Sequence, residues 1–289
     1  MSVVRHASPD AFLASAQPVI DRDEAMASSY VAGARAPSAN PRDADTIYLA
    51  TYANGDAFGA AIRRGGGPLW VGPSDARAAA AFAEDLFAAS NGSTATLSGI
   101  AGAQVACDAF ARAWAALTGR TCALRFRMRN HKLTRVAPLY LTSGIPRIAT
   151  MADIDWLINA HLAFIKEARV PDEPARVRAL VPGRVAQGRV WIRDDAEPAA
   201  FAGWTDAPPA AARIAPVYTL PHLRGRGHAT VLVASLAQAL LDGGRRALFL
   251  TTDLANPTSN AVYARIGFRP VSDVFQYDFV DAGNRGASH

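Results

Sequence analysis

The chain has little cysteine, with only Cys107 and Cys122 among its 289 residues. The two lack Cys-x-x-Cys spacing and no histidine cluster lies near them, which argues against a zinc site. Two thiols in a chain of this length also argue against a disulfide-stabilised scaffold. We therefore expect a reducing cytoplasm as the compartment, and no metal.

Long hydrophobic runs are absent as well. No stretch approaches the roughly 18 apolar residues that a membrane span needs, and the N-terminus lacks the charged-then-apolar pattern of a signal peptide. We expect no membrane association.

Charge is modest and dispersed. The net charge is +5, arginine dominates, and the arginines are scattered, which indicates solubility and an anionic ligand. A nucleic-acid-binding module would place aromatic residues among its arginines on a strand surface, and Leu223–Gly227 offers none. Nucleic acid is therefore not the expected partner. With 289 residues, half of them hydrophobic, the chain can form one large domain or two small ones.

The most informative segment is a glycine-rich basic turn between a predicted strand and a predicted helix. Residues 215–219 read as the strand, Arg224-Gly225-Arg226-Gly227-His228-Ala229 as the turn, and the helix runs to Leu241. Such a turn offers backbone N–H groups to a ligand, its glycines permit close approach, and the helix dipole favours negative charge. Arginine side chains add donors suited to phosphate oxygens. The segment predicts a site for a phosphorylated ligand.

Two common phosphate motifs do not fit this turn. A P-loop would end in Gly-Lys-Ser/Thr, which is missing. A dinucleotide fingerprint needs a third glycine or alanine where Thr230 stands, and an acid about twenty residues later. The pattern Arg-x-x-Gly-x-Ala (Arg224, Gly227, Ala229) instead resembles the pyrophosphate loop of the GNAT superfamily of acyl-CoA-dependent N-acetyltransferases. A second segment, Asn256 through Ser259 and Tyr263 to Gly267-Phe268, also resembles that family, and the likeness covers residues 145–281.

The resemblance implies a fold, a co-substrate and a set of site residues. The fold would be α/β (α+β), a mixed, mostly antiparallel sheet flanked by helices, and the co-substrate acetyl-CoA. The ligand-binding residues would be the splayed strand, the turn and two residues of the second segment: Val217, Tyr218, Thr219, Arg224, Gly225, Arg226, Gly227, His228, Ala229, Thr230, Asn256 and Ser259.

The element order occurs twice along the chain. In the first half we predict helices at 10–20, 23–33, 75–89 and 103–117, and strands at 47–53, 57–62, 68–71, 94–97 and 122–128, with a hairpin turn at Asn54-Gly55. In the second we predict helices at 153–166 and 173–180, strands at 189–193, 199–204, 215–219 and 248–253, and a last strand pair ending at 274–280. Pro73 and Pro221 differ by 221 − 73 = 148 positions, and Gly119 and Gly267 by 267 − 119 = 148. The equal offsets predict two tandem GNAT-like domains, residues 1–140 and 146–281, with a linker at 141–146 and a surface loop at 34–45.

The first copy lacks the residues that the family uses. Its turn reads Gly72-Pro73-Ser74-Asp75, where Asp75 would repel phosphate, and Ala115 stands where the second copy has Tyr263. We therefore expect it to be non-catalytic, a packing or dimerisation partner; the alternative is a surface that shapes substrate access to the second copy. A homodimer is compatible with the sequence.

The chemistry predicted for the second copy is transfer of acetyl to the amine of a small molecule or peptide. Tyr263 is the candidate general acid for the departing thiolate, because a well-placed phenol can protonate it. The general base stays open: no acid lies in residues 213–216, and the alternatives are Glu167, Asp253, His161, His222, a water relay or capture of a neutral amine.

Several of these residues also have structural interpretations. Asn256 could be a turn residue, Ser259 a helix cap and Gly267 a helix C-terminal residue, while Trp191 and Trp204 are more typical of core than of a substrate platform. The alternative to an enzyme is a non-catalytic acyl-CoA-binding regulatory protein.

Overall fold

The computed structural model describes residues 2–35, 46–53, 55–90, 97–139, 146–170, 173–207 and 210–281. The first half contains, in chain order, β1 (Ser2–His6), α1 (Pro9–Arg22), α2 (Glu24–Arg35), β2 (Ile47–Ala53), β3 (Asp56–Arg63), β4 (Leu69–Val71), α3 (Ala76–Ala89), β5 (Gly99–Gly102), α4 (Gln104–Thr118) and β6 (Thr121–Leu133). The second half contains β7 (Arg147–Ile148), α5 (Ile154–Glu167), α6 (Pro174–Ala186), β8 (Val190–Asp194), β9 (Pro198–Ala207), β10 (Ala211–Thr219), α7 (His228–Asp242), β11 (Ala247–Asp253), α8 (Pro257–Ile266) and β12 (Arg269–Val280).

The strands form one twelve-stranded sheet in the order β1-β2-β3-β4-β5-β12-β6-β11-β10-β9-β8-β7. Among the described strands only the pairs β4–β5 and β10–β11 are parallel, so the sheet is mixed and mostly antiparallel, as predicted. The repeat is visible in the helix ends, because Gly119 after α4 and Gly267 after α8 both take the left-handed conformation, with φ of 72° and 111°. Glycine adopts this conformation without steric cost and commonly ends helices.

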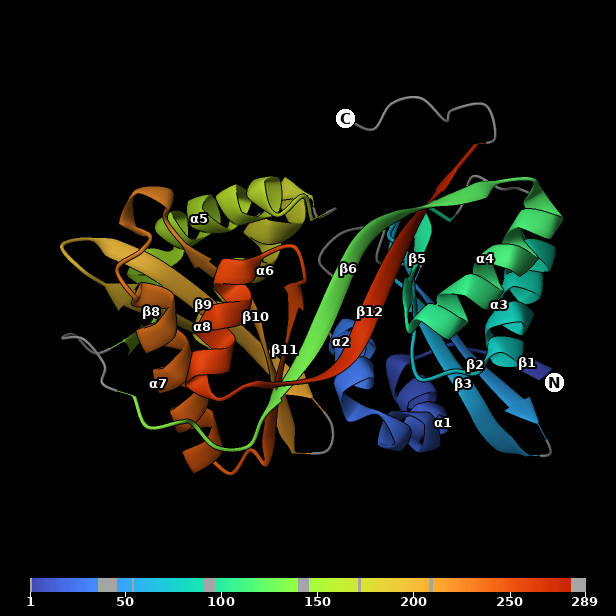
Figure 1. Cartoon of the computed structure of the whole chain (residues 1–289), viewed down its shortest axis with the longest axis horizontal. Helices are drawn as coiled ribbons and strands as arrows, with labels where there is room; N and C mark the ends of the chain where they lie inside the picture. Colours follow the sequence, from blue (N-terminus) through green and yellow to red (C-terminus); the bar gives the residue numbers. More distant parts are fainter. Residues whose placement is uncertain are drawn as a thin grey trace.

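The two halves exchange their last strands. β12 lies between β5 and β6, so the strand completing the first half's sheet comes from the end of the chain, while β6 pairs with β11 of the second half. Figure 1 shows β6 and β12 side by side across the middle of the molecule. The division into residues 1–140 and 146–281 stays a prediction, since the halves share this one sheet.

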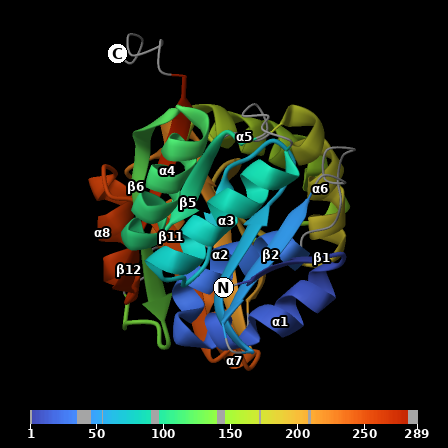
Figure 2. The same cartoon turned by 90° about the vertical axis from the view of Figure 1, so that its right-hand side faces the viewer.

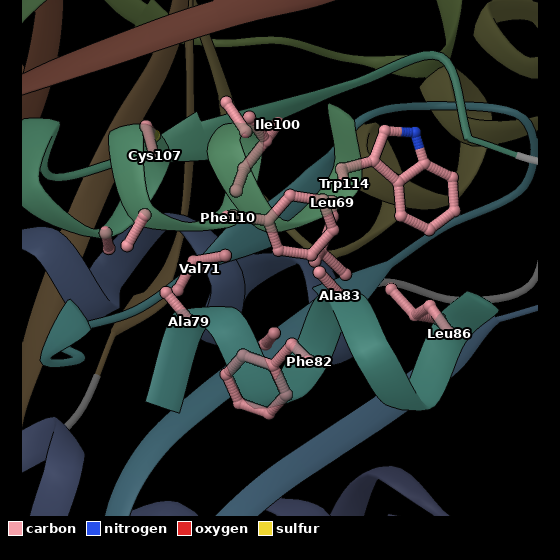
Figure 3. Close-up of a cluster of buried hydrophobic side chains, with 14 of the residues drawn as sticks. Leu69, Val71, Ala79, Phe82, Ala83, Leu86, Ile100, Cys107, Phe110 and Trp114 are labelled. Carbon is pink, nitrogen blue, oxygen red and sulfur yellow. The ribbon is translucent and has the colours of Figure 1, made fainter. Parts of the chain in front are cut away.

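Helices cover both faces of the sheet in each half. In the first half, α3 and α4 pack on one face around Phe82, Phe110 and Trp114, while α1 and α2 pack on the other. Figure 2 looks onto α3 and α4, and Figure 3 shows the cluster beneath them. Phe279 of β12 belongs to this cluster, so the first half's core includes a residue from the far end of the chain.

The second half repeats this arrangement, with α7 and α8 on one face and α5 and α6 on the other. A small cluster joins Ala25 of α2 to Ala207, Ala211, Ala247 and Phe249 of β9, β10 and β11, so that α2 bridges the two halves.

Several sequence predictions need correction. The strand of this region is β5 at Gly99–Gly102; of the strand predicted at 94–97, residues 94–96 lie outside the described residues and Leu97 is not in a strand. The last strand pair is one long strand, β12, and both β1 and the extension of β6 to Leu133 were missed. The β2–β3 hairpin is confirmed, although Asn54 lies outside the described residues, as do 36–45 of the predicted loop and 141–145 of the predicted linker.

Candidate active site

The strands β10 and β11 separate part-way along their length. Their parallel pairing covers Ala211–Arg213 and ends there, yet β10 continues to Thr219 and β11 to Asp253. A register shift against β9 between Ile214 and Val217 accompanies the separation. The backbone groups of residues 217–219 that face β11 therefore have no partner in that strand, and an opening lies between the two strands.

The same opening is closed in the first half. Subtracting 148 from 217 and 218 gives Leu69 and Trp70, and these two residues pair with Ile100 and Ala101 of β5. The ring of Tyr30 packs against Gly72 so closely that a Cβ there would lie 2.5 Å from it. The first half thus offers no gap for a ligand at the corresponding place.

The turn before α7 has the geometry of an anion site. Gly225 and Gly227 have φ of 79° and 81°, and nothing in the structure lies within 4 Å of a Cβ built on either. Gly227 is the N-cap residue before α7 and provides no side chain to cap the helix. The first N–H groups of this fifteen-residue helix are thus left for an external acceptor, where the helix dipole favours negative charge.

Arg224 is held at the mouth of this turn. Its guanidinium donates to Glu167 Oε2 at 2.8 Å and to the carbonyl of Thr219 at 3.1 Å, and it stacks over the ring of Tyr218. Tyr218 also donates to Glu167 Oε2, at 3.2 Å. The hydrogen bond from Arg224 lowers the pKa of the Glu167 carboxyl. A phosphate at the turn would meet an arginine that already has a carboxylate partner.

Arg226 and His228 lie near another carboxylate. Both are 3.6 Å from Asp195 Oδ2, but Arg226 is exposed whereas His228 is only 6% exposed. Neither ring nitrogen of His228 has a hydrogen bond, and burial lowers its pKa. The imidazole is therefore neutral at pH 7, with both of its ring nitrogens buried.

Tyr263 lies on α8 and is 9% exposed, packed edge-on against Phe268. Burial raises the pKa of its hydroxyl, so the phenol stays protonated at neutral pH. Among the described residues no group hydrogen-bonds to this hydroxyl. The proton is therefore available to a ligand.

The start of α8 corrects one structural interpretation. Asn256, not Ser259, caps the helix: the Asn256 side chain accepts from the backbone N–H of Ser259 at 3.0 Å. Asparagine at this position stabilises the helix by satisfying one of its first N–H groups. The hydroxyl of Ser259 is left for other contacts.

These residues line one cleft of about 2000 Å³. Every residue predicted for the site lines it except Arg226: Val217, Tyr218, Thr219, Arg224, Gly225, Gly227, His228, Ala229, Thr230, Asn256, Ser259 and Tyr263.

The sequence did not reveal the opposite wall of the cleft. The first half supplies Ser29, Tyr30 and Gly33 of α2, the turn 64–68, and Arg125, Phe126 and Met128 of β6. No motif marks these residues. Their placement follows from the exchange of β6, which brings its side chains beside β11.

The four side chains considered as a base separate into two pairs. Glu167 and Asp253 line the cleft, whereas His161 and His222 do not. His161 packs against Phe164 and Phe201, and burial lowers its pKa to about 4. His222 is exposed and bonds Glu197 at 2.9 Å.

The remaining predicted side chains have structural roles. Trp191 and Trp204 pack against the core beneath α7, as the core interpretation predicted. The described parts of the chain contain no group of His, Cys, Asp or Glu arranged to hold a metal ion. Nor do they contain a helix with the length and hydropathy of a membrane span.

Comparison with known proteins identifies this region. Residues 156–268 match the sequence model of the acetyltransferase (GNAT) family. No curated protein matches the chain. Among solved structures, a tandem GNAT protein from the clavulanic acid biosynthesis pathway is similar at 17% identity, covering all of both chains with a TM-score of 0.56.

Two further structures have a similar fold over nearly their whole length. A GNAT-family acetyltransferase from Colwellia psychrerythraea shares 14% identity over 97% of this chain and 100% of its own, with a TM-score of 0.57. A Drosophila protein shares 14% identity over 96% of this chain and 98% of its own, with a TM-score of 0.64. Residues 156–268 thus match the acetyltransferase (GNAT) family, and the chain as a whole has the tandem GNAT fold.

Proposed function

We propose that the protein transfers the acetyl group of acetyl-CoA to the amine of a small molecule or peptide, using one site in its second half. One observation carries the proposal. The opening between β10 and β11 connects the turn of Gly225 and Gly227 to the hydroxyl of Tyr263 within one cleft.

The residues present fit acetyl-CoA in both its charged and its extended parts. The free N–H groups at the start of α7 would bind the pyrophosphate, with Arg224, His228 and Thr230 nearby. The backbone groups of Val217–Thr219 on the side facing β11 would hydrogen-bond the amide groups of the pantetheine arm, much as a neighbouring strand would. Asn256 and Ser259 line the side of the cleft next to α8.

The reaction requires one bond to form and another to break. The amine nitrogen attacks the thioester carbonyl carbon, the carbon–sulfur bond breaks, and the thiolate leaves. Tyr263 would donate its proton to that thiolate, since burial keeps the hydroxyl protonated at neutral pH. Backbone N–H groups of β10 would stabilise the negative charge that develops on the carbonyl oxygen.

The proton of the amine needs an acceptor too. Asp253 lines the cleft, but its Oδ1 already accepts from the N–H of Ala255 at 2.8 Å. The Glu167 carboxylate is held by Arg224 and Tyr218. We propose that the amine reacts in its neutral form and loses its proton to water.

We further propose that the first half does no acetyl transfer. Its opening is closed by the pairing of Leu69 with Ile100, and Asp75 caps α3 by accepting from the N–H of Ala78 at 2.7 Å. A carboxylate therefore occupies the position where an anion would bind. The first half instead supplies the wall of the cleft that the acceptor meets.

Glu167 and Asp253, the two carboxylates considered as a base that line the cleft, are both engaged in hydrogen bonds, and this favours one rival, a protein that binds acyl-CoA without turnover. Thermal shift with acetyl-CoA, then thiol release over a panel of amines, separates the two. Binding together with amine-dependent thiol release supports the enzyme. Binding without thiol release for any amine would favour the rival, and no binding would refute both.

We also propose a cytoplasmic location, because Cys107 and Cys122 are both free thiols.

A further inference from the structure

The cleft extends beyond the opening that would hold acetyl-CoA, across the sheet of the first half. Its lining reaches from Tyr218 on β10 to Trp70 on β4, and the sheet order places five strand-to-strand steps between these two strands. At about 4.8 Å a step, the cleft spans about 24 Å. Its volume of about 2000 Å³ also exceeds the roughly 300–1,000 Å³ of most small-ligand sites. The part of the cleft over β4, β5, β12 and β6 is therefore left for a second molecule.

The floor of this part is one row of residues that crosses four strands. Trp70 of β4 pairs with Ala101 of β5, which pairs in turn with Gln276 of β12. Gln276 pairs with Phe126 of β6. Directly paired residues point to the same face of a sheet, and Leu69, the neighbour of Trp70, points into the core beneath α3 and α4. The row therefore lies on the opposite face, where Trp70, Gln276 and Phe126 line the cleft.

Gln276 carries a buried polar group without a partner. The residue is 6% exposed, and its side-chain amide makes no hydrogen bond to the described part of the protein. The indole N–H of Trp70 makes none to the described residues either. Neither group belongs to the fully enclosed unpaired atoms of the described chain, so each keeps some surface towards the cleft that it lines. A buried amide is costly unless its donors and acceptor are satisfied, so the floor is suited to a ligand that hydrogen-bonds Gln276.

The neighbours of Gln276 in the row are aromatic. Phe126 and Trp70 are both half-buried and lie on either side of it, one and two strand steps away, or about 5 and 10 Å. The charged residues beside Phe126 are Arg125 and Asp278, which pair with each other at 2.9 Å. Half-exposed rings inside a cleft favour an apolar ligand group. The floor thus presents a neutral amide between two rings.

This row also lies within reach of the reacting groups. Met128 of β6 pairs with Asp253, the last residue of β11, and Phe126 is two residues further, about 7 Å along the strand. From the end of β11 to Gln276 is therefore about 12 Å, the length of three to four extended residues at about 3.3 Å each. An acceptor of that size would have its amine at the opening and its other end on the row.

We propose that the acceptor is a short peptide or peptide-like amine with a large apolar side chain, bound along this row. The inference rests on the proposed function. An amide of the acceptor would donate its N–H to Gln276 Oε1 and accept from Gln276 Nε2, while the apolar side chain packs against Phe126. A charged group at this place would be buried beside a neutral amide, which costs more than burying an uncharged one.

The experiment uses the full-length chain and matched tetrapeptide amides with a free N-terminal amine. Peptides with phenylalanine at each position in turn are compared with the all-alanine peptide, and the best of them with its analogue in which one amide bond is an ester. Thiol release from acetyl-CoA gives kcat/KM. Calorimetry with the N-acetylated peptides in the presence of coenzyme A gives affinities that do not depend on turnover.

We expect one phenylalanine peptide to exceed the all-alanine peptide about 10- to 100-fold in kcat/KM, mainly through KM, because a phenyl ring is removed from water. Replacing the amide that meets Gln276 by an ester should lower kcat/KM about 3- to 10-fold. The affinities of the acetylated peptides should follow the same order.

Three variants assign these preferences to the row. Phe126→Ala should reduce the preference for phenylalanine, and Gln276→Leu should remove the preference for the amide over the ester. Leu124→Ala is the matched control, because Leu124 is also on β6 and is 50% exposed but does not line the cleft. It should keep both preferences, and all three variants should bind acetyl-CoA as the wild type does. If Gln276→Leu does not fold, Phe126→Ala and the wild-type peptide series still decide.

Two results would overturn the inference. One is equal kcat/KM and equal affinities across the phenylalanine, alanine and ester peptides in the wild type. The other is a loss in Phe126→Ala and Gln276→Leu that is the same for every peptide, since that identifies purely structural side chains. Failure of the proposed function looks different: no peptide would release thiol, while the calorimetric comparison of the peptides would still show whether the row selects them.

Discussion

Gly227 offers the sharpest single-residue test of the anion site. Its φ of 81° is left-handed, and no atom lies within 4 Å of a Cβ built there, so a side chain meets strain but no clash. Asparagine tolerates this conformation better than other non-glycine residues. We therefore expect Gly227→Asn to lower the free energy of unfolding by about 1 kcal/mol.

The substitution should reduce the affinity for acetyl-CoA much more than it reduces the free energy of unfolding. The new side chain would stand in front of the N–H groups that begin α7 and would prevent a phosphate from reaching them. Losing two hydrogen bonds to a charged group costs about 3–6 kcal/mol, so the affinity for acetyl-CoA should fall about 10²- to 10⁴-fold.

Gly119→Asn provides the control. Gly119 has a φ of 72°, equally open surroundings and a place outside the cleft. It should lose similar stability in urea unfolding but bind acetyl-CoA normally in calorimetry. Wild-type affinity in Gly227→Asn, or equal losses of affinity in the two variants, would refute the assignment of the turn.

Three further predictions address the acid, the pH dependence and the exchanged strands. Tyr263→Phe should leave acetyl-CoA binding nearly unchanged and lower kcat about 10²- to 10⁴-fold; an unchanged kcat, where chemistry limits the rate, would make Tyr263 a packing residue. Burial lowers the pKa of His161 from 6.5 to about 4, so its contribution to stability is complete above pH 6.5 and is lost as the pH falls towards 4. His161→Gln should remove up to about 3 kcal/mol of that dependence in urea unfolding, and an identical pH profile would contradict it. Residues 147–281 expressed alone should be poorly soluble, because β11 loses β6 and Phe279 loses its core; a well-behaved fragment with full affinity would show that the first half is dispensable.

The sequence predicted the local elements of the site because each depends on neighbours in the chain. Gly225 and Gly227 mark a left-handed turn before a helix, and Gly267 marks the end of α8, wherever those elements lie in the fold. The offset of 148 holds for strands too: β11 begins at Ala247 and β5 at Gly99, and 247 − 99 = 148. Applied to β11, the same offset would have placed the start of β5 at Gly99.

Features that depend on tertiary pairing could not be predicted in this way. Nothing in the residues of β12 indicates that it inserts between β5 and β6. The strand would bury the same alternating side chains whether it inserted there or paired within the second half. The wall of the cleft from α2 and β6 follows from that insertion. The sequence of residues 213–216 likewise indicated only that no acid lies there. The hydrogen bond from Arg213 to Ser28, 185 positions earlier in the chain, depends on the tertiary fold.

The central claim is that one half of a duplicated chain kept the acetyl-CoA site while the other closed it. Calorimetric titration of the full-length protein with acetyl-CoA tests this most directly. We predict one site per chain, with an affinity that falls about 10²- to 10⁴-fold in Gly227→Asn and is unchanged in Gly119→Asn. Two equivalent sites, or no binding at all, would contradict the account.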